Sequence, residues 1–355
     1  MFLHGIFPPI TTPFYPDGNV YHKKLEANVE RYSRTPSAGI VVEGSTGEAI
    51  LLSDQERRDV LKTAIAAAAP NKVMVAGTGV ESAIETLHLT EYAAELGYDA
   101  AMVRTPHYYK KQLLPANILA FYRTVADRSP LPLVIYNFPQ ATGYDIPAEV
   151  VIELADHPNI IAIKESSGNL EKVKRMVDGT RHIKRSATVT ETFDAVNPRM
   201  LKAAQSDSSN VGRLVSVEAL GGSAKPSSSA VTVVGKLKTR QKEVGFQVMV
   251  GAAHQLEPSL ALGAVGAILA FACPAPMACY EIYAAIKDGD TSLAREKQDR
   301  VKLAAQRVVS ELGVPGVKYA MDLNGYYGGP SRLPFLPLTA DLKSEIEKLM
   351  TGIKS

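Results

Sequence analysis

Cysteine, net charge and long uninterrupted apolar runs are all scarce in this chain of 355 residues. Its two cysteines, Cys273 and Cys279, are too few for a disulfide framework and form no plausible metal site, so they suit a reducing compartment. The formal net charge of +2 gives no electrostatic argument for nucleic acid or a membrane as partner. The longest apolar stretch, residues 260–277, is interrupted by glycine and proline, which predicts a buried strand with its flanks and not a membrane span.

Targeting signals are also missing from the start of the sequence. Met1-Phe2-Leu3-His4 lacks the basic region and apolar core of a secretory signal, and no basic, serine-rich leader follows. Hydrophobic residues make up 46% of the chain and charged residues 21%, the balance of a soluble globular protein. We therefore expect a cytoplasmic protein, with a mitochondrial address left open.

What the chain does contain is an alternation of short apolar segments with segments of helical spacing. Ser53 and Ser82 each begin a capping-box pattern, and Gly97 stands where a helix would end. The predicted strands are Ile6–Phe14, Gly39–Glu43, Lys72–Gly77, Ala100–Thr105, Leu133–Asn137, Ile160–Lys164, Phe246–Val250 and Gly266–Phe271. Eight strand–helix repeats predict an α/β protein with a (β/α)₈ TIM barrel. The alternative is an open doubly wound sheet, which usually has fewer strands and a glycine-rich first turn that this chain lacks.

One spacing departs from this regular pattern. The interval between the sixth and seventh predicted strands contains extra material at about residues 185–240, with serine-rich and glycine-rich patches at 206–209, 221–223 and 226–229. This composition predicts a mobile loop insertion on the barrel exterior that is dispensable for folding, with a functional lid as the alternative. The predicted organisation is a barrel over 1–272, interrupted by the insertion, and a C-terminal helical region over 273–355.

The chemistry centres on Lys164, which ends the apolar run Ile160–Ile163. A lysine at the end of a buried strand is unfavourable if charged and unpaired, and the neutral amine is a nucleophile toward carbonyl groups. The alternative is a lysine that turns out into solvent where the strand ends.

Other strand ends carry groups that would support this nucleophile. Active sites of TIM barrels lie at the carboxyl ends of the strands. There the second strand leads into Gly44-Ser45-Thr46-Gly47-Glu48, whose hydroxyls and backbone N–H groups can bind a carboxylate. The fifth strand contributes Tyr136, which can transfer protons, and the fourth ends in the aromatic turn Thr105–Tyr109. A lysine, a tyrosine and a hydroxyl–glycine loop at one end of a barrel are what Schiff-base chemistry on a 2-oxo acid requires.

With these motifs in order, the chain resembles the dihydrodipicolinate synthase and N-acetylneuraminate lyase superfamily of class I aldolases. The motifs are Pro9–Phe14, Gly44–Glu48, Tyr136–Pro139 and Ile163–Glu165. The resemblance covers nearly the whole chain except the insertion. Within the superfamily the chain looks most similar to 4-hydroxy-2-oxoglutarate aldolase, through the stretches Gly5–Pro9, Asp99–Val103, His157–Ile160 and Gly325–Pro330.

The resemblance implies a role for each matching residue. Lys164 would form the Schiff base with pyruvate, Tyr136 would act as acid and base, and Thr46 would relay protons to it. The pyruvyl carboxylate would be held by Ser45, Thr46 and Gly47. Ser166 would line the pocket for the second half of the substrate, and the backbone carbonyl of Ile268 would face the substrate. Tyr108 would complete the relay from a neighbouring subunit, which implies a homo-oligomer, a dimer or tetramer. The resemblance implies no metal and no cofactor.

One departure bears on the reaction. Dihydrodipicolinate synthases carry an arginine two residues after the proline that follows their tyrosine, and here that position is Ala141. The missing guanidinium removes a carboxylate clamp, which favours cleavage of a 4-hydroxy-2-oxo acid, most simply 4-hydroxy-2-oxoglutarate, to pyruvate and glyoxylate. The alternatives are dihydrodipicolinate synthase, a 3-deoxy-2-oxo sugar-acid aldolase, and a catalytically silent homologue with a binding role.

Overall fold

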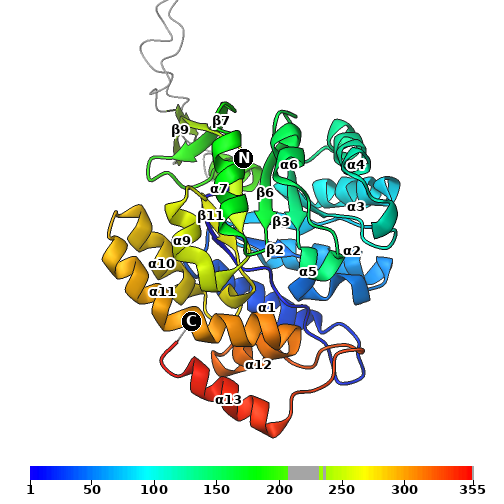
Figure 1. Cartoon of the computed structure of the whole chain (residues 1–355), viewed down its shortest axis with the longest axis vertical. Coiled ribbons are helices and arrows are strands. Elements are labelled where there is room, and N and C mark those ends of the chain that lie inside the picture. Colours follow the sequence, from blue (N-terminus) through cyan, green and yellow to red (C-terminus); the bar gives the residue numbers. More distant parts are fainter. Residues whose placement is uncertain (207–231, 235–236, 354–355) are drawn as a thin grey trace, which may run out of the picture.

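The computed structural model describes residues 1–206, 232–234 and 237–353, and its centre is a barrel of parallel strands (Figure 1). The strands are β1 (Gly5–Phe7), β2 (Gly39–Val42), β3 (Val73–Gly77), β4 (Ala100–Arg104), β5 (Leu133–Asn137), β6 (Ile160–Glu165), β10 (Gln247–Val250) and β11 (Gly266–Ile268). They follow the order β1-β11-β10-β6-β5-β4-β3-β2. Backbone hydrogen bonds from Ala38 N to Ile6 O and from Ile10 N to Val41 O, each 2.9 Å, join β1 to β2 and close the barrel. The predicted TIM barrel is confirmed.

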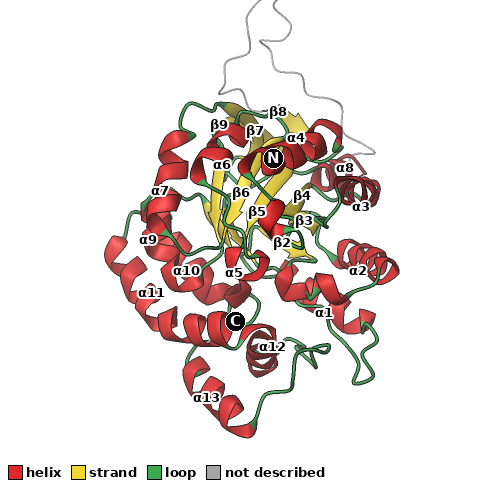
Figure 2. Ribbon diagram, turned by 45° about the vertical axis from the view of Figure 1, so that its right-hand side comes forward, coloured by secondary structure: helices red, strands yellow, loops and turns green. Residues whose placement is uncertain are grey.

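Helices surround these strands (Figure 2). Around the barrel lie α1 (His22–Ser33), α2 (Asp54–Ala67), α3 (Ala83–Leu96), α4 (Pro115–Arg128), α5 (Pro139–Thr142), α6 (Ala148–Ala155), α7 (Leu170–Gly179) and α9 (Leu256–Ala261). Local signals set their ends as predicted. Ser53 forms a complete capping box with Glu56, Ser82 accepts a hydrogen bond from Glu85 N, and Gly97 ends α3 at a φ of 92°.

Side chains of the strands alternate between two apolar layers. One set fills the barrel interior and includes Val41, Met102, Val134, Ala162 and Ile268. Their neighbours along each strand point outward and pack under the helices in the larger core. Apart from an irregularity near the start of β6, where Ile161 and Ala162 both join the interior layer, the side chains alternate, so each residue at the carboxyl end of a strand faces either the barrel mouth or the helix layer.

The insertion forms a small antiparallel sheet in the order β7 (Arg185–Thr190), β9 (Leu237–Val244), β8 (Thr232–Val234), together with α8 (Pro198–Ser206). This sheet covers the amino ends of the barrel strands, beside the chain N-terminus in Figure 1. Arg185 donates to Ile160 O at 2.7 Å, and the fully buried Asn197 donates to Pro70 O at 2.8 Å. The expectation of a mobile excursion is therefore wrong for the described residues 185–206 and 237–244, because they pack against the barrel. Residues 207–231, with most of the serine-rich and glycine-rich patches, lie outside the described residues.

The C-terminal region consists of α10 (Pro276–Lys287), α11 (Thr291–Ala305), which continues as a π-helix over Gln306–Glu311, α12 (Gly313–Leu323) and α13 (Ala340–Met350). It is tied to the loop after β2 by a buried ion pair. Lys318 Nζ lies 2.5 Å from Glu48 Oε1, and the two side chains are 1% and 0% exposed. Arg332 N donates to the other Glu48 oxygen at 2.8 Å. The two thiols, Cys273 and Cys279, are fully buried in the same part of the core.

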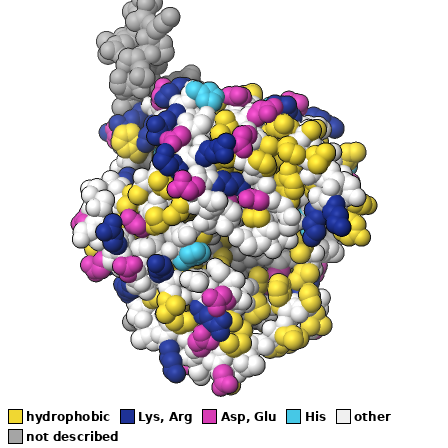
Figure 3. Space-filling view, viewed as in Figure 1, with side chains coloured by type: hydrophobic (Ala, Val, Ile, Leu, Met, Phe, Trp, Pro, Cys, Tyr) yellow, Lys and Arg dark blue, Asp and Glu magenta, His cyan; other side chains and the backbone are white. Residues whose placement is uncertain are grey.

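Charged side chains of both signs are interspersed over the face of the molecule shown in Figure 3. Within the described ranges, no helix is long and apolar enough to cross a membrane. The cytoplasmic location expected from the sequence stays a prediction.

Candidate active site at the barrel mouth

Lys164 and Tyr136 lie side by side at the carboxyl ends of two neighbouring strands. Parallel pairing of β5 with β6 places Tyr136 opposite Lys164, and strand alternation points both side chains into the barrel mouth. The lysine is 4% exposed and the tyrosine 5%. Lys164 Nζ lies 4.1 Å from the centroid of the Tyr136 ring. The lysine therefore does not turn out into solvent, and its amine is held against the phenol that was expected to move protons.

Of the two adjacent hydroxyls in the loop after β2, Ser45 is the one that meets the tyrosine. Ser45 Oγ lies 3.1 Å from Tyr136 Oη. Thr46 is 8% exposed, and within the part of the chain that the structure describes no hydrogen bond joins it to Tyr136. Ser45 is therefore the hydroxyl within hydrogen-bonding distance of Tyr136, and the relay role expected for Thr46 stays a prediction. Thr46 remains a candidate ligand for the substrate carboxylate.

The loop that carries these hydroxyls is shaped by close backbone contacts. Gly47 O accepts a hydrogen bond from Thr12 Oγ1 at 2.6 Å, and a Cβ at Gly47 would lie only 3.0 Å from Ile10 O. A larger residue at position 47 would therefore displace the loop. Glu48 follows at a φ of 55°, a left-handed conformation that its buried ion pair with Lys318 holds in place.

A cavity of about 480 Å³ adjoins the contact between Ser45 and Tyr136. Its rim includes Tyr108, which is 76% exposed and packs edge-on against Tyr109. The carboxylate of Glu81 accepts hydrogen bonds from the backbone N–H groups of His107 and Tyr108, at 2.9 and 3.0 Å. Partial burial opposes ionisation of Glu81, but these bonds outweigh it and lower its pKa. The Tyr108 loop is therefore anchored, while its aromatic side chain stays largely uncovered in the single chain.

Glu43 lines the same cavity and was not singled out from the sequence. It sits at the end of β2 with a φ of 61°, and its side chain is fully buried. One carboxylate oxygen accepts a hydrogen bond from Arg57 Nε at 2.9 Å, and the other has no partner among the described residues. Burial raises the pKa of Glu43 to about 8 despite the opposing effect of Arg57.

The remaining predicted residues also lie at the carboxyl ends of the strands. Ser166 N donates to Asn137 O at 2.9 Å, and the Ser166 hydroxyl fits against Gly251, where a Cβ would lie 1.9 Å from Oγ. Ile268 ends β11 with its side chain in the barrel interior. Ala141 lies exposed on α5, and as an alanine it provides no guanidinium at this position. The substrate contacts expected for Ser166, Gly47 and the Ile268 carbonyl stay predictions.

The model of the dihydrodipicolinate synthetase family matches residues 2–207 and 197–353, which together span nearly the whole sequence. The chain belongs to the dihydrodipicolinate synthetase family. Membership confirms the resemblance to the superfamily and the expectation of a lyase, while the closer resemblance to 4-hydroxy-2-oxoglutarate aldolase stays a prediction.

Curated relatives of this chain include 4-hydroxy-tetrahydrodipicolinate synthases. The synthase of Methanothrix thermoacetophila is 29% identical over 347 residues, which cover 98% of this chain and 96% of the relative. The synthase of Methanosarcina barkeri is 38% identical over 177 residues, which cover 50% of this chain and 59% of the relative.

Solved structures of the family share the fold over their full length. The chloride-inhibited dihydrodipicolinate synthase from Acinetobacter baumannii, complexed with pyruvate, is 26% identical, with a TM-score of 0.77 and coverage of 99% of this chain and all of that one. A prophage protein of the family from E. coli K12, in complex with pyruvate, is 24% identical, with a TM-score of 0.76 and coverage of 99% of both chains. The chain therefore shares the fold of these structures.

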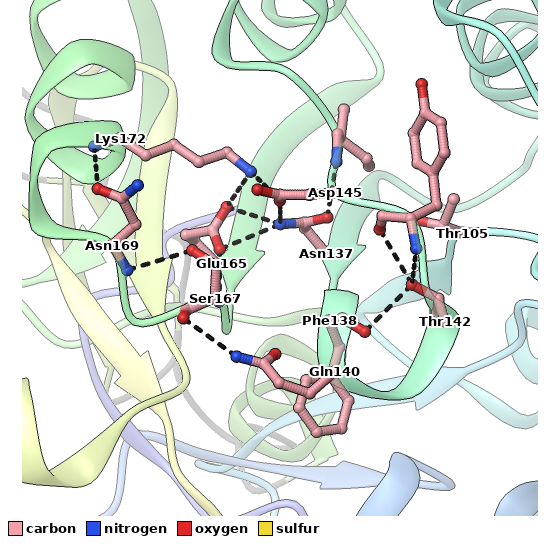
Figure 4. Close-up of polar contacts among 12 residues, drawn as sticks. Thr105, Asn137, Phe138, Gln140, Thr142, Asp145, Glu165, Ser167, Asn169 and Lys172 are labelled. Atoms are coloured by element: carbon pink, nitrogen blue, oxygen red, sulfur yellow. Dashed lines mark hydrogen bonds and ion pairs between the residues drawn. The ribbon is translucent and has the colours of Figure 1, made fainter.

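The family motifs also contain residues whose importance the sequence did not reveal. Asn137 and Glu165 directly follow Tyr136 and Lys164 along their strands. Their side chains belong to a network of polar contacts that includes Asp145 and Lys172 (Figure 4). A charged residue at the end of a buried strand was a usable signal for Glu165. No local signal identified its partner Lys172, which lies on a helix. Among the described residues, no cluster of three or more His, Cys, Asp or Glu is placed to hold a metal ion.

Proposed function

We propose that the protein forms a Schiff base between Lys164 and pyruvate and uses it to make or break a carbon–carbon bond with an aldehyde partner. The observation that carries the proposal is the buried amine of Lys164, 4.1 Å from the ring of a tyrosine whose hydroxyl meets Ser45 at the mouth of a family barrel.

The geometry suits each step of this chemistry. The unprotonated amine attacks C2 of the 2-oxo acid, the carbinolamine loses water, and the resulting imine draws electrons from the adjacent carbon. A proton leaves C3 to give an enamine that attacks the aldehyde carbon, and the cleavage direction reverses these steps. Tyr136 stands next to the nitrogen and hands protons to and from Ser45. The loop around Thr46 holds the carboxylate.

The names of the relatives favour condensation over cleavage. Both curated relatives described above are 4-hydroxy-tetrahydrodipicolinate synthases, so the leading candidate is condensation of pyruvate with aspartate semialdehyde. The second candidate is cleavage of a 4-hydroxy-2-oxo acid such as 4-hydroxy-2-oxoglutarate. One observation favours it, namely that Ala141 stands where the synthases carry an arginine for the second carboxylate.

Borohydride trapping tests the shared chemistry. Incubation with pyruvate and borohydride should add the mass of a reduced pyruvyl group to the parent protein. Lys164→Ala should give no adduct and no turnover, because no other amine replaces the nucleophile. Lys174→Ala, which removes an exposed lysine, should behave like the parent. An adduct that persists in Lys164→Ala would contradict the assignment.

Substrate assays then separate the two candidates. Consumption of aspartate semialdehyde with pyruvate should exceed release of pyruvate from 4-hydroxy-2-oxo acids if the synthase reading holds. The reverse ratio, together with a gain in synthase activity for Ala141→Arg, would establish the cleavage reading.

A further inference from the structure

Two strands each end in a pair of consecutive polar residues with opposite orientations. On β5 the pair is Tyr136 and Asn137, and on β6 it is Lys164 and Glu165. The first member of each pair faces the barrel mouth, so the second member must face the helices. The outward pair is bonded directly: Asn137 Nδ2 donates to Glu165 Oε1 and Oε2 at 3.1 and 3.0 Å. The two strand ends are thus joined immediately beside the reactive side chains.

The outward pair is also connected to the loops that follow both strands (Figure 4). Ser167 N donates to Glu165 at 2.6 Å, which fixes the turn after β6. Ile146 N donates to Asn137 Oδ1 at 3.0 Å, which fixes the segment after β5. The contacts of Glu165 require a carboxylate that accepts hydrogen bonds, and the contacts of Asn137 require one orientation of its amide.

A buried carboxylate of this kind needs a counter-charge. The Glu165 side chain is fully buried, and Lys172 Nζ from α7 lies 3.2 Å from its Oε2. The Lys172 side chain is itself only 8% exposed, and it also pairs with Asp145, whose side chain is half exposed. Lys172 is therefore the cation that allows Glu165 to remain an acceptor for Asn137 and Ser167.

We propose that Lys172 and Glu165 are positioning residues of the Schiff-base site. By holding Glu165 against Asn137, Lys172 sets the relative placement of the ends of β5 and β6, and so the distance between Tyr136 and the imine on Lys164. Neither residue touches the substrate. This inference rests on the proposed function, and it adds a second lysine whose role is geometric.

Lys172→Met tests the proposal with two separate readouts, the rate of borohydride-trapped adduct formation at saturating pyruvate and the pyruvate concentration at half-maximal rate. The rate should fall by about tenfold to a hundredfold, since a misplacement of about 1 Å can cost roughly a hundredfold. The pyruvate concentration at half-maximal rate should stay within about twofold of the parent value, because the carboxylate-binding loop at 44–48 is not part of the network. Lys174→Met, on the same helix and paired with the partly exposed Asp178, is the matched control and should match the parent in both readouts.

A double variant separates the positioning role of Lys172 from its contribution to stability. Lys172→Met combined with Glu165→Gln removes the unpaired buried charge, so the melting temperature should recover relative to Lys172→Met alone. The rate should stay low, because a glutamine cannot accept from Asn137 with two oxygens. If Lys172→Met is insoluble, the fully charged Lys172→Arg should fold and keep a rate close to the parent, while Glu165→Gln alone should be slow.

A parent-like adduct rate in folded Lys172→Met, or a rate that recovers together with stability in the double variant, would overturn the positioning role. Absence of an adduct in the parent itself would instead refute the proposed function.

Discussion

Ser45 and Thr46 are adjacent hydroxyls with different contacts, and this difference leads to a prediction at the scale of single residues. Ser45→Ala removes the group that lies 3.1 Å from Tyr136 Oη, so the turnover number should fall by about a hundredfold with little change in KM for pyruvate. Thr46→Val keeps the shape and removes a candidate carboxylate ligand, so it should mainly raise that KM. Steady-state kinetics of the two variants checks both. The opposite pattern would assign the proton relay to Thr46 and the carboxylate contact to Ser45.

The raised pKa of Glu43 gives a prediction about pH. Burial raises this pKa from 4.5 to about 8 in the folded protein, so the folded state retains a proton that the unfolded chain has lost. The stability contributed by this proton is fully present below pH 4.5 and is lost as the pH rises through about 8. The melting temperature of the parent should therefore fall over this window more steeply than that of Glu43→Gln. Parallel plots of melting temperature against pH for the two proteins would show that the pKa of Glu43 is not raised in the folded protein.

At the scale of single residues, the sequence revealed the side chains that face the barrel mouth better than the residues that hold them in place. Lys164 and Tyr136 end apolar strands inside recognisable motifs, so their positions followed from strand alternation. The choice between Ser45 and Thr46 depended on the turn geometry of a short 3₁₀ segment, which residue types do not specify. Lys172 depended on a contact between a helix and a strand end, and its spacing from Glu165 carries no distinctive pattern.

Among the elements, the insertion yields the clearest prediction. Asn197 caps α8 by accepting a hydrogen bond from Met200 N at 2.9 Å. Its amide also donates to Pro70 O and Lys72 O, which lie just before β3. Asn197→Ala removes the cap of α8 and the hydrogen bonds to Pro70 O and Lys72 O, which should lower the free energy of unfolding by about 1–3 kcal/mol. Gln241→Ala, an exposed position on β9 with one side-chain contact, should have little effect. Chemical denaturation measures both, and an unchanged Asn197→Ala midpoint would show that the insertion is not coupled to the barrel.

The elements of the barrel were predictable because each strand is an apolar run bounded by clear stop signals. The insertion was harder, since only Thr239 and Val244 of β9 are buried and the strand contains four charged side chains. Such a strand gains its stability from pairing with β7, which is distant in sequence. Its composition therefore resembles that of a loop, although each of its residues pairs with a residue of β7 or β8.

At the scale of the whole molecule, the exposure of Tyr108 predicts an assembly in which a neighbour covers it. Tyr108 is 76% exposed on an anchored loop at the rim of the cavity, a position suited to completing the site of an adjacent subunit. If so, Tyr108→Phe and Lys164→Ala should each be inactive, and mixed oligomers of the two should regain part of the activity. Mixed oligomers verified by native mass spectrometry that stay inactive would show that Tyr108 serves its own chain.

The insertion sheet and the two buried thiols together make this protein convenient to tether. The chain has two cysteines, both fully enclosed, and burial raises the pKa of Cys279 to about 12, so neither should react readily with maleimides. A cysteine introduced at Lys238, exposed on β9, would then be the accessible attachment point. Because β9 covers the amino ends of the strands, a dye or a solid support joined there would sit on the opposite face from the barrel mouth, and immobilised molecules would present their catalytic openings outward.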